Sequence, residues 1–283
     1  MTNLFYLFSI VLGLSGQNVV KKAYAQKADG KGVYSFNTVV SLSAILFFVL
    51  SPSPLNFHIS ILPYAIGFAV CYAVASVFTV LAISCGSLSL TSLLLSYSLM
   101  IPTFYGLIFL HDPISWGFIV GLVFLVVSLF LINKTKETAR FSFKWLVYVL
   151  LSFVGNGMCT VLQKMQQDAS QGAYKNEFMI VALAIVAAIT LTLSLIKEKR
   201  EIGSYVRSGW LLALICGLLN GMVNMFVMIL SGRMPVSLMF PLVSAGGLIL
   251  TYAVSKFLYK ETLSKTQFIG FVFGLAAVVF LNT

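Results

Sequence analysis

The polar residues of this chain that could do chemistry are mostly side-chain amides set inside apolar stretches. Asn220 and Asn224 are four residues apart, so on a helix both amides project from one face. The other polar side chains expected at mid-depth are Gln17, Asn18, Asn37, Tyr72, Tyr97, Asn156 and Gln163. A single amide could simply join two helices, but the set as a whole favours a polar cavity that binds a small ligand.

Two lysines occupy matching places, because Lys22 ends the first apolar stretch and Lys164 ends the sixth. Each could extend along its helix to the lipid headgroups, which is the commoner fate of such a lysine. Alternatively, the pair could hold a carboxylate or a phosphate of a ligand, since charge at depth is costly and usually functional. The substrate-binding candidates are therefore Asn18, Lys22, Tyr72, Tyr97, Asn156, Lys164, Asn220 and Asn224.

Groups for catalysis lack the spacing that they need. The sequence has no paired carboxylates, metal-ligand pattern or Gly-rich phosphate loop, and His58 and His111 fall in expected loops. The acidic residues also fall in loops or at helix ends, which disfavours proton-coupled efflux of cationic drugs. We expect no enzyme, metal or cofactor. A polytopic membrane enzyme or sensor is the alternative of another class, because loops could bring acids together.

The elements that position these residues must lie in a membrane. Of the 283 residues 59% are hydrophobic and 9% are charged, which is too apolar for a chain whose outer surface faces water. Runs of about twenty apolar residues cross the hydrocarbon core as helices. Ten are predicted, near residues 3–22, 34–51, 61–83, 87–110, 114–133, 143–165, 177–197, 209–231, 235–258 and 264–282.

The formal net charge of +10 belongs to the same picture. Lys and Arg stand at the ends of the apolar runs, which indicates topology and headgroup contact rather than nucleic-acid binding. Fifteen of the eighteen follow odd-numbered helices. Because positive loops stay in the cytoplasm, this count predicts that both termini lie outside.

The chain is also built twice from one unit. The segment HDPISWGFIVGLVFLVVSLFLIN, from His111 to Asn133, returns 149 residues later as KETLSKTQFIGFVFGLAAVVFLN, from Lys260 to Asn282. At the front of each half, Gly13 corresponds to Gly155 and Lys22 to Lys164 with a shift of 142. A unit that crosses five times leaves its copy inverted in the bilayer. We expect an all-α integral membrane protein of two inverted five-helix repeats, at residues 1–133 and 143–283, with a linker at 134–142.

Small residues and prolines interrupt several of these apolar runs. They predict broken helices that open on a cavity, with close helix packing as the alternative for the glycines. The positions are Gly13, Gly16, Gly155, Gly157, Pro102, Pro241, Gly246 and Gly247.

These patterns resemble the drug/metabolite transporter superfamily, specifically its EamA-like ten-helix members. The likeness rests on the duplication, on KETLSKTQFIGFVFGLAAVVFLN at residues 260–282, and on the lysines that end helices 1 and 6, as in LQK at 162–164. The resemblance implies a secondary carrier of small metabolites, often amino acids, with a central cavity lined mainly by helices 1, 3, 4, 6, 8 and 9. It also implies cytoplasmic termini, against the charge count.

The sequence thus predicts an alternating-access transporter of a small polar or zwitterionic metabolite, with an amino-acid-like substrate favoured. A carrier of an anionic or phosphate-bearing metabolite is the alternative, since related carriers bind phosphate with Lys or Arg. The expected partners are the substrate and membrane lipids, with no nucleic acid. A monomer is sufficient, and the expected location is a bacterial plasma membrane.

Overall fold

The computed structural model describes residues 2–51, 55–85, 91, 94–95, 97–111, 116–133, 143–259 and 265–280. Within these ranges the fold is all-helical, which confirms the predicted class. The α-helices are α1 (Thr2–Lys27), α2 (Val33–Val49), α3 (Leu62–Cys85), α5 (Met100–Phe109), α6 (Trp116–Asn133), α7 (Phe143–Ala169), α8 (Lys175–Lys197), α9 (Ile202–Ser231), α10 (Val236–Tyr259) and α11 (Lys265–Phe280). Short 3-10 helices are η1 (Ile59–Ile61), η2 (Tyr97–Leu99) and η3 (Lys199–Glu201).

Nine of the ten predicted spans coincide with one described helix each, with ends that differ by a few residues. The tenth, at 87–110, contains η2 and α5, and its residues 87–90, 92–93 and 96 lie outside the described part. Five described helices are long and apolar enough to cross a membrane: Asn3–Lys27, Ile59–Cys85, Phe143–Ala169, Lys175–Lys197 and Ile202–Ser231.

The predicted helix interruptions are wrong, because α1, α5, α7 and α10 each run unbroken through their glycines or proline. The glycines instead permit close packing. A Cβ on Gly13 would lie 2.4 Å from Cγ2 of Val223 in α9. A Cβ on Gly155 would lie 2.7 Å from the backbone oxygen of Cys71 in α3. Backbones can approach this closely only where the side chain is a hydrogen atom.

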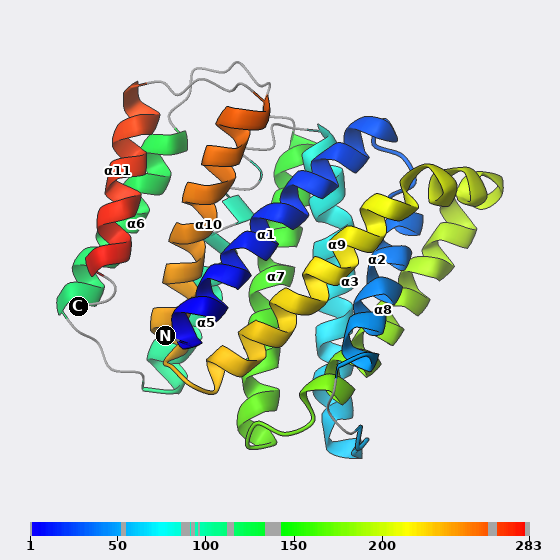
Figure 1. Cartoon of the computed structure of the whole chain (residues 1–283), viewed down its shortest axis with the longest axis horizontal. Coiled ribbons are helices and arrows are strands. Elements are labelled where there is room, and N and C mark those ends of the chain that lie inside the picture. The colour runs from blue at the N-terminus through cyan, green and yellow to red at the C-terminus, as the bar shows by residue number, and fades with distance from the viewer. Residues whose placement is uncertain are drawn as a thin grey trace.

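The helices pack in a pattern in which each contact between the halves has a counterpart (Figure 1). Helix α1 packs on α9 and α10, while α7 packs on α3 and α5. Helix α2 packs on α9, and α8 packs on α3. Helices α6 and α11 lie side by side at one edge of the molecule, where Ser128 Oγ donates to the carbonyl of Gly270.

The connections α1–α2 and α7–α8 have the same backbone geometry. Each has left-handed residues at three positions, and the members of each pair are 142 residues apart: Asp29 and Gln171, Gly30 and Gly172, Gly32 and Tyr174. Backbone hydrogen bonds recur at the same spacing, as in Phe36 N to Gly32 O at 2.9 Å and Phe178 N to Tyr174 O at 3.0 Å. Figure 1 places the two connections at opposite ends of the helices.

Part of the repeated tail segment lies outside the described residues, namely Asp112, Ser115, Glu261, Ser264 and Asn282. The same holds for the whole proposed linker at 134–142. Gly121 and Gly270, the mid-segment glycines of the two copies, are described and lie in α6 and α11.

Candidate functional site

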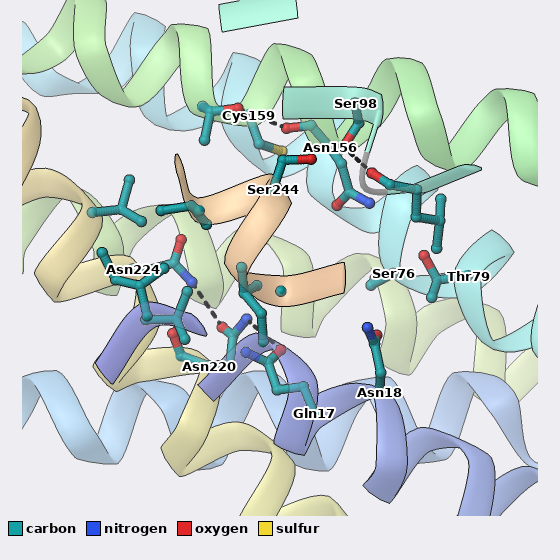
Figure 2. Close-up of a pocket in the computed structure, with 18 of the residues that line it drawn as sticks. Gln17, Asn18, Ser76, Thr79, Ser98, Asn156, Cys159, Asn220, Asn224 and Ser244 are labelled. Carbon is teal, nitrogen blue, oxygen red and sulfur yellow. Dashed lines mark hydrogen bonds between the residues drawn. The ribbon is translucent and has the colours of Figure 1, made fainter. Parts of the chain in front are cut away.

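A cavity of about 160 Å³ lies between α1 and α7, in the middle of the bundle (Figure 2). Its walls come from α1, α3, α7, α9, α10 and the segment 95–98. These are the six spans that the family resemblance implied. The lining is Ile10, Leu14, Ser15, Gln17, Asn18, Lys21, Tyr72, Ser76, Thr79, Leu95, Ser98, Asn156, Cys159, Thr160, Gln163, Asn220, Val223, Asn224, Val227, Phe240, Val243, Ser244 and Gly247.

Five of the eight sequence-predicted binding residues line this cavity: Asn18, Tyr72, Asn156, Asn220 and Asn224. They come from α1, α3, α7 and α9, so the fold brings together residues that are up to about two hundred positions apart. Tyr72 stacks on Phe68 of its own helix with ring centroids 5.4 Å apart. Its ring therefore forms part of a fixed wall.

Four amides form a chain of hydrogen bonds that runs from α7 through α9 to α1. Gln163 Nε2 donates to Asn224 Oδ1 at 2.7 Å. Asn224 Nδ2 donates to Asn220 Oδ1 at 3.1 Å, and Asn220 Nδ2 donates to Gln17 Oε1 at 3.3 Å. Figure 2 shows the last two of these bonds.

The direction of this chain is fixed by the backbone. Asn224 Nδ2 also donates to the backbone carbonyl of Asn220 at 2.9 Å, and a carbonyl can only accept. The orientation of Asn224 therefore sets that of each neighbour in turn. The chain ends at Gln17, whose Nε2 is buried and has no hydrogen-bond partner within the described structure. One donor is thus left over at the α1 end.

Two further amides point into the cavity from opposite sides (Figure 2). Asn18 extends from α1 and Asn156 from α7. No hydrogen bond within the described part of the chain engages either side-chain amide. Both are therefore available to a ligand as donors and as acceptors.

The other three predicted residues lie away from the lining. Lys164 pairs with Asp168 one turn along α7, at 2.8 Å, and donates to the carbonyl of Ser231 at 3.1 Å. Lys22 is half-buried on α1 but does not line the cavity. Tyr97 is half-buried in η2, and it also lies outside the lining.

Sequence reasoning did not single out Lys21, although this lysine lines the cavity. The available signal was its spacing, because Lys21 follows Gln17 by four residues and so shares its helix face. Several hydroxyl groups at the cavity wall were also missed: Ser76, Thr79, Ser98, Thr160 and Ser244. Such hydroxyls are common in apolar helices, where most of them bond to the preceding turn.

The described residues that line the cavity include no Asp or Glu. Nor do the described parts of the chain contain a group of His, Cys, Asp or Glu side chains that could hold a metal ion. The cavity is thus suited to binding through neutral amides, hydroxyls and one cation.

Comparison with known families gives this geometry a context. Residues 143–283, from the start of α7 to the end of the chain, match the EamA-like transporter family. They form an EamA-like domain. The EamA family is one of transporters and not of enzymes, so the expectation of a non-enzyme is confirmed and the membrane-enzyme alternative is excluded. With its long apolar helices, the chain is a multi-pass membrane protein.

Relatives outside the family match are distant. An uncharacterized protein of Haemophilus influenzae is 23% identical over 189 residues, which are 64% of this chain. The match spans 62% of that relative's length. A solved crystal structure of a protein superimposes with a TM-score of 0.74 over 100% of this chain and 98% of its own. Its sequence identity of 12% shows a shared fold alone.

Proposed function

We propose that this EamA protein is a secondary carrier that moves a small polar or zwitterionic metabolite, most favourably an amino-acid-like one, across the plasma membrane. The observation that carries the proposal is the central cavity, which is lined from both halves and holds unengaged amides of Asn18 and Asn156. Binding sites at the interface of two repeats are typical of secondary carriers.

The carrier mechanism rests on an inverted repeat of residues 1–133 and 143–283. Left-handed backbone recurs at three positions with one spacing of 142 residues, at opposite ends of the molecule. Gly13 and Gly155, which share that spacing, make corresponding close contacts, with α9 and with α3. Two such halves can exchange conformations, so that the cavity opens first to one side of the membrane and then to the other.

The cavity chemistry supports a substrate with several hydrogen-bonding groups. Asn18 and Asn156 offer donors and acceptors from two sides, while Asn220 and Asn224 are held in place by the amide chain. Tyr72 closes one wall beside them. A volume of about 160 Å³ suits a molecule of the size of a small amino acid.

The structure gives little support to a phosphate site formed by Lys22 and Lys164. The Lys164 charge is already paired with Asp168, and neither lysine lines the cavity. A nucleotide sugar would also exceed the cavity volume. We therefore keep the amino-acid-like substrate ahead of the phosphate-bearing one.

Flux measurements with purified protein in proteoliposomes test the proposal. Labelled alanine, serine and threonine should enter protein-containing vesicles faster than empty ones. Preloading with the unlabelled compound should accelerate entry of the label, because a carrier returns faster when loaded whereas a channel does not. An absence of flux for a broad panel of small polar metabolites would refute the carrier.

A further inference from the structure

The cavity carries a charge in one half only. Lys21 of α1 lines it, and the position equivalent to Lys21 in the second half, at the spacing of 142, is the neutral Gln163. Gln163 is already committed to Asn224. A ligand therefore meets a positive charge at the α1 side and neutral groups at the α7 side.

The unfilled donor of the amide chain lies on the same helix. Gln17 is only 4% exposed, lines the cavity, and has an Nε2 with no acceptor among the described residues. Lys21 stands four residues further on, so its ammonium and the Gln17 amide share one face of α1. A buried donor without a partner is costly, and a cation near the middle of a membrane is more so. Both costs fall if one ligand group accepts from both residues.

We propose that Gln17 and Lys21 form the carboxylate-binding subsite of the cavity. One oxygen of the substrate carboxylate accepts a hydrogen bond from Gln17 Nε2, and the carboxylate pairs with Lys21 Nζ. This inference rests on the proposed carrier function and deepens it, because it names the group that the substrate must carry and the end at which it binds.

Charge balance selects a carboxylate over a phosphate. One lysine without a carboxylate partner among the described lining residues matches one negative charge. A phosphate monoester carries about −1.5 to −2 near neutral pH and would leave part of its charge unpaired. The oxygens of Asn18 and Asn156 remain for an ammonium or hydroxyl group at the other end of the substrate.

Thermal unfolding of the purified full-length protein in detergent micelles tests the subsite, with defined probes. The probes are L-alanine, L-serine and L-threonine, the carboxamide of each, and glycerol 3-phosphate. A probe that binds the folded protein raises the melting temperature in proportion to its occupancy. We expect stabilisation by the three acids and at least about tenfold weaker apparent affinity for their carboxamides, the loss that accompanies removal of a charge-assisted hydrogen bond.

Variants assign the effect to the two residues. Lys21→Gln and Gln17→Leu should each weaken the acids at least about tenfold and leave the carboxamides unchanged. Lys21→Arg should retain the preference for acids, because it keeps the charge. Lys22→Gln is the matched control, since it removes the neighbouring charge outside the lining, and it should behave as the unmodified protein.

The outcomes separate this subsite from the carrier function. Equal affinity for acids and carboxamides, tighter binding of glycerol 3-phosphate, or an unchanged acid preference in Lys21→Gln would each overturn the subsite and leave the carrier standing. If Lys21→Gln does not fold, the acid-to-carboxamide ratio of the unmodified protein still decides. No stabilisation and no flux with any probe would overturn the carrier and the subsite together.

Discussion

Gln163 of α7 donates from Nε2 to Oδ1 of Asn224 in α9 at 2.7 Å, and this bond joins two walls of the cavity. Asn224 in turn holds Asn220, which holds Gln17 of α1. The amide chain therefore ties three helices together at the depth of the cavity. Loss of any middle member strands buried polar groups on both sides of it.

The first prediction concerns this chain. Gln163→Leu leaves Asn224 Oδ1 without its donor and should lower the free energy of unfolding by about 1–3 kcal/mol, the cost of a buried unsatisfied acceptor. Denaturant unfolding in micelles measures the change. Gln26→Leu, which alters an exposed glutamine near the end of α1, is the control and should stay within about 0.5 kcal/mol. Equal effects of the two substitutions would contradict a structural role for the chain.

The second prediction concerns substrate contacts. Asn18→Leu and Asn156→Leu remove amides that point into the cavity, so each should reduce the kcat/KM of transport by about tenfold or more. Tyr97→Phe should leave transport unchanged, because its side chain does not line the cavity. Initial rates of labelled substrate entry into proteoliposomes decide between these outcomes. A loss in Tyr97→Phe as large as in Asn156→Leu would move the site elsewhere.

The third prediction concerns helix approach. Gly155→Ala places a Cβ 2.7 Å from the Cys71 backbone oxygen and 3.0 Å from Ala75 Cβ, so α7 and α3 must separate. Overpacking of this kind costs about 1–3 kcal/mol. Gly203→Ala meets nothing within 4 Å and should be neutral or stabilising, since alanine favours a helix over glycine. Melting temperatures of the two variants should therefore move apart, and a shared shift would count against the packing.

The fourth prediction concerns a carboxylate that joins the halves at one end of the molecule. Glu198 accepts hydrogen bonds from the backbone amides of Tyr34 at 2.8 Å and Ser35 at 2.9 Å, at the N-terminus of α2. Ser194 Oγ also donates to it at 2.9 Å. Glu198→Ala should therefore destabilise the fold by about 2 kcal/mol, in the range of a lost hydrogen bond to a charged group.

The opposite end has the corresponding contact with its polarity reversed. There Glu177, at the N-terminus of α8, accepts from the backbone amide of Asn56, and both positions are 142 from their counterparts Ser35 and Glu198. Glu177→Ala should destabilise as well. Glu201→Ala, which removes an exposed acid bonded to Tyr205, serves as the control for both. A drop in melting temperature in the control as large as in Glu198→Ala would refute the role of the Glu198 contacts.

The fifth prediction concerns orientation. Fifteen of eighteen Lys and Arg residues follow odd-numbered helices, so a reporter fused to the C-terminus should be active outside the cytoplasm. A periplasmic phosphatase reporter should give signal, and a cytoplasmic fluorescent reporter at the same residue should not. The opposite pattern would establish the cytoplasmic termini that the family resemblance implies.

Much of the scaffold followed from the sequence, because helix position in a membrane depends on local composition. Runs of apolar residues predicted α1, α7 and α8 to within a few residues at each end. The spacing of 142 that joins Gly13 to Gly155 was likewise visible before the fold, and so were the amides that a lipid environment makes conspicuous. These features need no knowledge of which helices touch.

Tertiary structure decided which polar groups meet. Gln17 and Asn220 are 203 residues apart, and nothing in either local sequence indicates that one accepts from the other. Lys21 and Lys22 are adjacent, yet only Lys21 lines the cavity, because consecutive residues on a helix point about 100° apart. The sequence by itself determined that polar groups lie deep in an apolar bundle. The packing of α1 against α9 decided which of them are spent on each other and which remain for a substrate.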